Sequence, residues 1–121
     1  MEGKGTAGAG GERIAAEYLR LAGYRIIETN HRTGHLEIDI IAELEGCLVF
    51  VEVRTRRSGN FGDALSSVDR GKVCRIRRAA GRYLSALKGG RHYDTVRIDV
   101  IGIDIRASRG EMSLRHIRGA A

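Results

Sequence analysis

The chain has 121 residues, of which 42% are hydrophobic and 30% charged, and its formal net charge is +6. This balance is typical of one globular domain and excludes a disordered chain. No apolar run approaches the ~20 residues that a membrane span requires. The start of the chain lacks the apolar core of a secretory signal. The positive charge favours a polyanionic partner such as nucleic acid, although a soluble basic protein without such a partner fits it equally well.

The first half of the chain predicts one helix followed by three strands. Residues 1–10 are rich in glycine and are expected to form a flexible leader. Apolar residues at helical spacing predict a helix from about Gly11 to Ala22, and Gly23 is a natural stop signal. The segment "YRIIETNHR" predicts the first strand, and the next two are predicted at Leu36–Glu43 and Cys47–Arg56.

The second half predicts a loop, a long helix and one or two strands. Glycine and serine mark the segment after Arg56 as a loop, and a helix is predicted from about Val68 to Leu87. The segments "TVRIDVIGIDI" and "MSLRHI" predict the fourth strand and a short fifth strand. This order predicts a single α/β domain over residues 1–121, with a mixed central sheet of four to five strands flanked by helices. The two cysteines, Cys47 and Cys74, form no disulfide framework, which favours a cytoplasmic location.

The stretch "LEIDIIAELEGCLVFVEVR" places acids within two strands that otherwise consist of apolar residues. A two-residue turn at Glu45 and Gly46 sets the hairpin register, in which the apolar residues pair on one face. These pairs are Ile38 with Val53, Ile40 with Val51, and Ala42 with Val49. On the other face, Asp39 would lie opposite Glu52, and Glu37 would lie opposite Arg54.

Two carboxylates placed directly opposite each other repel and destabilise a sheet. A hard divalent cation such as Mg²⁺ would compensate for this repulsion, because it prefers oxygen ligands from one or two carboxylates. Arg54 could pair with Glu37 or contact a phosphate. The alternative is a solvated strand face on which these charges only form cross-strand ion pairs.

The segments "GHLEIDIIA" and "FVEVRTR" resemble the core motif of the restriction-endonuclease-like PD-(D/E)xK superfamily. The whole chain resembles the YraN-like uncharacterised family, which is similar to archaeal Holliday-junction resolvases. The segments "GGERIAAEYLRLAGYRIIETNHRTGHLEIDIIA", "GDALSSVDRGKVCRIRRAAGRYL" and "VRIDVIGI" extend the resemblance over nearly the full length. It implies a restriction-endonuclease-like sheet and hydrolysis of DNA phosphodiester bonds.

By this resemblance, Asp39 and Glu52 would bind Mg²⁺ or Mn²⁺ and act in catalysis, and Glu12 on the first helix would complete the metal site. Glu12 also fits a simple role as an acid that stabilises a helix start. Arg54 stands where the family motif has lysine. Arginine stays protonated and could not act as a base, but it could orient a phosphate or offset developing negative charge.

Basic residues gather after the core motif and on the long helix. The candidates for nucleic-acid contacts are Arg56, Arg57, Lys72, Arg75 and Arg78, and Lys72 matches a lysine of the family near the site. Contacts of this kind give affinity for phosphates without reading the sequence, whereas a solvated helix face fits each residue taken alone. The chain has no Trp and 5% aromatic residues, so binding through base stacking is not expected.

The leading hypothesis is a Mg²⁺- or Mn²⁺-dependent endonuclease that acts on DNA, with branched or recombination intermediates as candidate substrates. The second is a nucleic-acid-binding module that keeps the fold but does not cleave, and Arg54 favours it. The third is an interaction protein whose acids are ion-paired. The resemblance to resolvases adds a homodimer as an expectation, and no membrane partner is expected.

Overall fold

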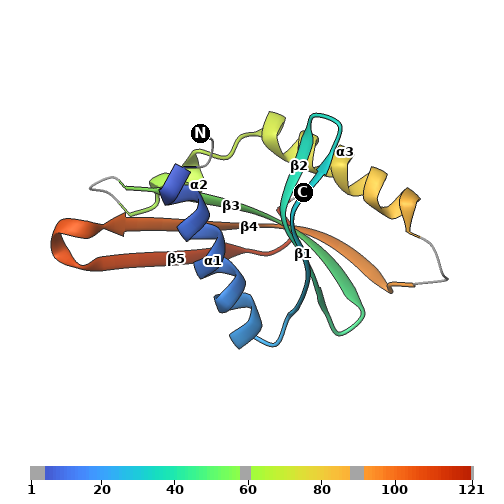
Figure 1. Cartoon of the computed structure of the whole chain (residues 1–121), viewed down its shortest axis with the longest axis horizontal. Coiled ribbons are helices and arrows are strands. Elements are labelled where there is room, and N and C mark those ends of the chain that lie inside the picture. Colours follow the sequence, from blue (N-terminus) through green and yellow to red (C-terminus); the bar gives the residue numbers. More distant parts are fainter. Residues whose placement is uncertain (1–4, 58–60, 88–91, 121) are drawn as a thin grey trace.

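The computed structural model describes residues 5–57, 61–87 and 92–120. Its elements in chain order are α1 (Gly5–Leu21), β1 (Arg25–Thr33), β2 (Leu36–Leu44), β3 (Cys47–Arg56), α2 (Asp63–Ser66), α3 (Arg70–Ala86), β4 (Thr95–Arg106), the 3₁₀ helix η1 (Ala107–Arg109) and β5 (Glu111–Ile117). The five strands form one sheet in sequence order, β1-β2-β3-β4-β5 (Figure 1). Only β3 and β4 pair in parallel, and the other neighbours are antiparallel. This mixed sheet confirms the predicted α/β, restriction-endonuclease-like fold.

A tight turn sets the register of β2 on β3. Glu45 and Gly46 both have positive φ angles, 48° and 80°, as a two-residue type I′ hairpin turn requires. The strands then pair Leu44 with Cys47 and continue to Ile40 with Val51, which confirms the predicted register over this part of the hairpin.

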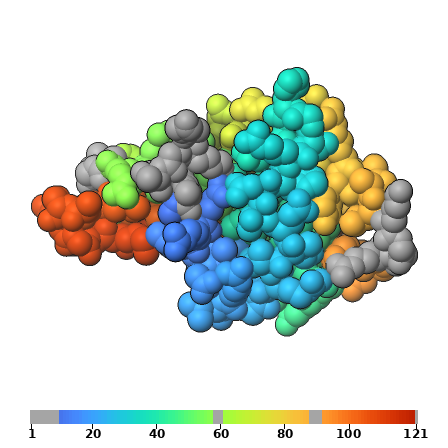
Figure 2. All heavy atoms as spheres, viewed as in Figure 1, coloured from blue at the N-terminus to red at the C-terminus, as the bar shows by residue number. Residues whose placement is uncertain are grey.

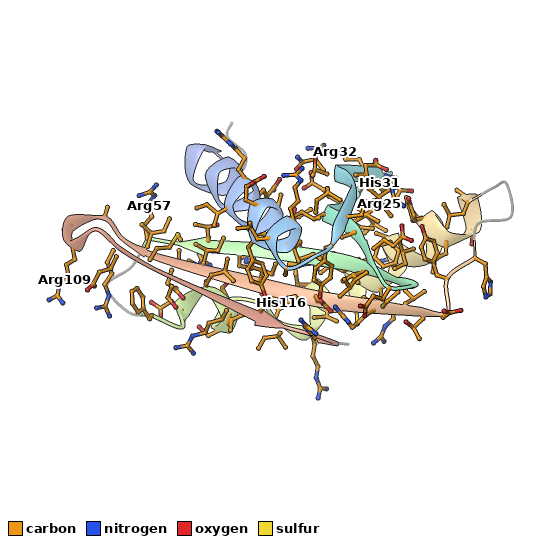
Figure 3. All side chains as sticks on the ribbon, turned by 90° about the horizontal axis from the view of Figure 1, so that it is seen from below. Arg25, His31, Arg32, Arg57, Arg109 and His116 are labelled. Carbon is orange, nitrogen blue, oxygen red and sulfur yellow. The ribbon has the colours of Figure 1, made fainter. Side chains whose placement is uncertain are left out.

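The sheet separates two layers of buried side chains. On one face, α1 packs Ala15, Ala16 and Leu19 against the sheet residues that include Val49, Val51 and Ile101. On the other face, α3 packs Ile76, Ala79 and Ala80 against Leu48, Phe50 and Ile98. Figure 3 shows the sheet from its edge, with α1 on one side.

The predicted pairing of Ile38 with Val53 is wrong, because the β2–β3 ladder extends from the turn only as far as Ile40 and Val51. An unbroken strand would place Ile38 and Ile40 on the same face. Ile40 packs on the α1 side, whereas Ile38 packs with Ile41 on the α3 side. The break lies at Asp39, and Asn30 of β1, which falls at the same point of the β1–β2 ladder, has a positive φ of 53°. This kink directs the β1–β2 hairpin away from the rest of the sheet (Figure 1).

Two further segments differ from the sequence-based expectation. The first helix begins at Gly5 rather than near Gly11, so residues 5–10, which were expected to be a flexible leader, are helical. Extending an existing helix by a turn avoids the unfavourable nucleation step. The segment after Arg56, expected to be a loop, contains the short helix α2. Residues 1–4 and 58–60 of these two segments lie outside the described residues.

The two cysteines are free thiols, as expected. None of the helices in the described residues is long and apolar enough to cross a membrane.

Candidate functional site

Asp39 lies at the point where β2 separates from β3. Its side chain is 2% exposed, and Oδ2 accepts a hydrogen bond of 2.8 Å from the backbone N–H of Val53. The side chain therefore replaces a backbone acceptor that the departing strand no longer supplies. The expected direct pairing of Asp39 with Glu52 does not form part of the strand ladder, which ends at Ile40 and Val51. Instead, the Asp39 carboxylate bonds to the backbone of the residue that follows Glu52.

Glu52 occupies the middle of β3 and is 4% exposed. Its Oε2 atom lies 3.5 Å from Nζ of Lys72, near the start of α3. The helix begins at Arg70, two residues before this lysine, and the Asp69 side chain caps it by accepting a 2.9 Å hydrogen bond from the Lys72 N–H. The cap fixes the first turn of α3 and with it the position of the lysine beside the acid.

Arg54 lies two residues after Glu52 on β3, and its side chain is tied to α2. Its Nε atom donates a 3.0 Å hydrogen bond to Oγ of Ser67, and Ser67 Oγ in turn donates a 2.6 Å bond to the Ala64 carbonyl. The expected pair of Glu37 with Arg54 is therefore wrong: Glu37 contacts Arg32 of the neighbouring strand at 3.5 Å. The kink in β2 explains this change of partner, because it carries Glu37 away from β3.

Glu12 enters from α1, on the opposite side of the sheet from α3, and is 8% exposed. The helix backbone touches β3 at the preceding residue. A Cβ atom on Gly11 would lie 1.9 Å from Oγ1 of Thr55, so only glycine allows this approach. Glu12 is thus held close to the end of β3 that follows Glu52 and Arg54. Its role as a metal ligand stays a prediction.

The chemistry of Asp39 and Glu52 fits a hard divalent cation, since both are buried carboxylates at one junction of two strands. Mg²⁺ is commonly held by one or two carboxylates and completes its shell with water and substrate phosphate. Across residues 5–57, 61–87 and 92–120, no three His, Cys, Asp or Glu side chains are grouped as a complete ligand set. Water and substrate would therefore have to supply the remaining ligands.

The predicted nucleic-acid contacts fall into two separate groups. Lys72, Arg75 and Arg78 belong to α3, where Arg75 and Arg78 are exposed. Arg56 and Arg57 are exposed at the end of β3. Figure 3 shows Arg57 toward the end of the sheet that carries Arg109, away from Arg32 and His31. Of the five residues, Lys72 lies beside one of the acids, with Nζ 3.5 Å from Oε2 of Glu52.

A second buried charge cluster, which the sequence analysis missed, joins β4 to β5, α1 and the C-terminal segment. The Asp99 side chain is 0% exposed. Arg97 donates to both of its oxygens at 2.8 and 2.9 Å, His116 Nε2 lies 2.7 Å from Oδ2, and the Gly119 N–H donates at 3.0 Å. Tyr18 and Tyr24 complete the cluster through 2.8 Å hydrogen bonds to His116 and Arg97. We call these residues the Asp99 network.

The Asp99 network keeps its aspartate ionised. Burial alone would raise the pKa of Asp99, but the hydrogen bonds from His116, Arg97 and the Gly119 N–H outweigh it and hold this pKa below its usual value. The same hydrogen bonding to Asp99 raises the pKa of Arg97. Alternation of Arg97 and Asp99 on one strand was the only sequence signal for the network, and it resembles that of an ordinary solvated face.

The mixed sheet, the flanking helices and the two buried carboxylates at the β2–β3 junction define the class of protein: an α/β domain of the restriction-endonuclease-like type. The comparison with known families agrees with this class. The sequence model of the family described as "Uncharacterised protein family UPF0102" matches residues 11–103 of this chain. The chain belongs to this family, which confirms the predicted YraN-like membership.

Relatives with the same description cover nearly the whole chain. A UPF0102 protein of Beutenbergia cavernae is 40% identical over 119 residues, which are 98% of this chain and 98% of the relative. A UPF0102 protein of Alkaliphilus oremlandii is 45% identical over 98 residues, covering 81% of this chain and 84% of the relative. Among solved structures, Pyrococcus furiosus SfsA in complex with Ca²⁺ is 20% identical with a TM-score of 0.38. The match covers 93% of this chain and 63% of the SfsA chain.

Proposed function

We propose that the chain is a Mg²⁺- or Mn²⁺-dependent endonuclease that hydrolyses DNA phosphodiester bonds, with branched or recombination intermediates as candidate substrates. The observation that carries this proposal is the burial of Asp39 and Glu52 at the β2–β3 junction, with Lys72 3.5 Å from Glu52. Burying two acids is costly unless their charge is compensated, and such groups concentrate at functional sites. The junction thus places two carboxylates that could bind a cation beside a positively charged lysine that could bind a phosphate.

Each residue has a distinct part in this proposal. Asp39 and Glu52 would hold the cation, and water and substrate would supply its other ligands, because residues 5–57, 61–87 and 92–120 contain no group of three potential ligand side chains. A metal-binding role for Glu12 stays a prediction from the sequence. When bound, such an ion polarises a phosphate and lowers the pKa of a coordinated water. Lys72 and Arg54 would contact the phosphate oxygens and offset the negative charge that grows during attack. Because arginine stays protonated, Arg54 does not take the proton from the attacking water.

The test uses labelled four-way, flap, duplex and single-stranded DNA, each incubated with Mg²⁺, Mn²⁺ or EDTA. Asp39→Asn keeps an oxygen that can accept the Val53 N–H bond, so it removes the charge while preserving the kink. Asp94→Asn is the matched control, because Asp94 is exposed beside the Gly46 turn at the other end of β3. We expect metal-dependent products from the wild type and from the control.

Asp39→Asn should reduce the cleavage rate by more than ~100-fold, since even partners outside the ligand shell contribute 10- to 100-fold. Equal cleavage by Asp39→Asn, purified in the same way, would assign the activity to a contaminant. No product with any substrate and either metal would refute the endonuclease.

A second candidate is a nucleic-acid-binding module without cleavage. It is favoured by Arg54, which replaces the motif lysine and whose Nε atom is engaged by Ser67 at 3.0 Å. The two functions separate in one pair of assays. The binding module retains salt-dependent affinity for DNA in EDTA and gives no product when a metal is added.

A further inference from the structure

A groove runs between α3 and the end of the β1–β2 hairpin. It consists of a shallow, wide-open depression of about 750 Å³ and a more enclosed adjoining one of about 230 Å³, which share Thr33, Arg82 and Ala86 as lining residues. We call this feature the α3 groove. Figure 2 shows the hairpin lying directly against α3, and the kink at Asp39 is what brings it there. Arg82 Nη1 donates to the Thr33 carbonyl at 3.4 Å, which links the two walls.

The α3 groove is lined by positive charge. Arg78 and Arg82 line the larger depression, Arg32 and Arg82 line the smaller one, and no carboxylate is among the described residues that line them. In the described part of the chain, neither Arg78 nor Arg82 forms an ion pair with an acid. Arg32 lies 3.5 Å from Glu37, but its side chain is 79% exposed, so this pair neutralises little of its charge. The groove therefore suits an anion.

The floor of the α3 groove is unusually bare. Gly81 lies in the middle of the seventeen-residue helix α3, where glycine is a poor helix former. A Cβ atom on Gly81 would meet nothing within 4 Å, and its φ is not positive, so neither packing nor conformation requires glycine there. Ser85 and Ala86, which also line the groove, are short as well. A ligand backbone could approach the helix closely at this point.

The aromatic side chains of the groove are turned toward their neighbours rather than toward a ligand. Tyr83 packs edge-on against His31 and Phe50, with ring centroids 5.1 and 5.7 Å apart. His31 also contacts Glu28 at 2.7 Å. Single-stranded nucleic acids are usually held by stacking of bases on open aromatic faces. Without such a face among the described lining residues, the groove fits the phosphate backbone of a duplex better than unpaired bases.

The α3 groove is connected to the acids by a line of cations. Lys72, Arg75, Arg78 and Arg82 recur every three or four residues and so lie along one side of α3. Lys72 is beside Glu52, and Arg82 follows ten residues later (82 − 72), about 15 Å along the helix axis. This length corresponds to roughly four to five base-pair steps of B-DNA at ~3.4 Å each.

We propose that the α3 groove binds the phosphate backbone of a double-stranded arm of the DNA, about four to five base pairs from the phosphate that Lys72 and Arg54 would contact. This inference deepens the proposed function, and its link to cleavage rests on that function. It predicts that duplex DNA on one side of the reacting phosphate contributes to binding through Arg78 and Arg82.

The test measures binding of fluorescein-labelled random-sequence duplex by fluorescence anisotropy in EDTA, over a series of salt concentrations. The variant Arg78→Gln/Arg82→Gln is compared with Arg77→Gln/Arg115→Gln, which removes the same net charge from exposed positions outside the groove. Each lost phosphate contact should make the slope of log K against log salt shallower by ~0.9. We expect the groove variant to lose about 1.8 from this slope and the control variant to retain the wild-type slope.

A second variant tests the groove without changing charge. Gly81→Leu replaces a poor helix former by a good one and fills the floor. It should bind the duplex more weakly than the wild type while its melting temperature stays equal or rises. Unchanged affinity in this variant would contradict a ligand lying on the floor of the groove.

The outcomes separate the groove from the endonuclease. Equal slopes for the groove and control variants would overturn the α3 groove and leave cleavage untouched. Loss of binding only in the groove variant, with no cleavage by any protein, would support the groove and refute the endonuclease. No binding of duplex by the wild type in EDTA would overturn the groove proposal outright.

Discussion

Replacing Asp99 with asparagine should remove much of the ionic stabilisation that joins β4 to β5 and the C-terminal segment. The variant keeps the size of the side chain and one oxygen acceptor, but it loses the negative charge. Arg97, whose side chain is 24% exposed, then loses the carboxylate that its Nε atom contacts at 2.8 Å, and His116 loses its anionic partner. Breaking a buried ion pair by neutralising one partner costs about 3–5 kcal/mol.

Because Arg97 keeps some access to water, we expect the lower end of this range, about 3 kcal/mol. An unfolding entropy of ~2.1 cal/mol/K per residue gives ~0.25 kcal/mol/K for the 121-residue chain, so the melting temperature should fall by about 12 °C. A typical domain has only ~5–15 kcal/mol of stability in total. The effect should therefore be easy to measure.

Urea and thermal unfolding followed by circular dichroism provide the assay. Glu45→Gln is the control, because Glu45 is exposed in the β2–β3 turn, and a surface change of this kind usually alters stability by less than ~0.5 kcal/mol. A double-mutant cycle with Arg97→Gln would isolate the pair. A loss below ~1 kcal/mol for Asp99→Asn, or a coupling energy near zero in the cycle, would refute the claim that the network stabilises the fold.

Three further predictions concern stability. Since the pKa of Asp99 is lowered in the folded state, its contribution to stability is present above the unfolded pKa of ~3.9 and is lost as the pH falls through the lowered folded pKa. Urea midpoints from pH 6 to pH 2 should therefore decline less steeply for Asp99→Asn than for the wild type. Parallel curves for the two proteins would contradict this. Gly102→Ala should cost about 1–3 kcal/mol, because the new Cβ would lie 2.8 Å from Cγ of Leu65, whereas Gly10→Ala, with open space around it, should cost nothing; equal melting temperatures of the two variants would count against this packing. Asp69→Ala should cost about 1 kcal/mol through loss of the α3 cap and Asp69→Asn much less, and chemical denaturation with equal losses for both would exclude capping as the cause.

Local sequence signals were sufficient for most of the fold. Alternating apolar residues identified the strands. The Glu45–Gly46 turn fixed the β2–β3 register near the turn, because a two-residue hairpin turn allows only one pairing of the residues that flank it. Helical spacing identified α3 to within two residues of its observed start, Arg70. These features depend on neighbours within a few residues, so the chain encodes them directly.

The arrangement of the candidate site depends on contacts between distant parts of the chain. Strand periodicity gave no sign that β2 would break at Asp39, because the break is stabilised by the Val53 N–H, fourteen residues away. Lys72 reaches Glu52 only because α3 packs across the sheet, and Arg54 turns to Ser67 only because α2 lies beside it. The residue types of the site could be chosen from sequence, but their partners could not.

The Asp99 network and the α3 groove follow the same physical rule. The hydrogen bond between Tyr18 and His116 spans 98 positions of the sequence, and that between Arg82 and Thr33 spans 49. Periodicity and turn chemistry describe which side chains share a face, but not which faces meet. That choice is made when the two layers pack on the sheet, since burial of the apolar residues fixes the positions of the charged ones carried with them.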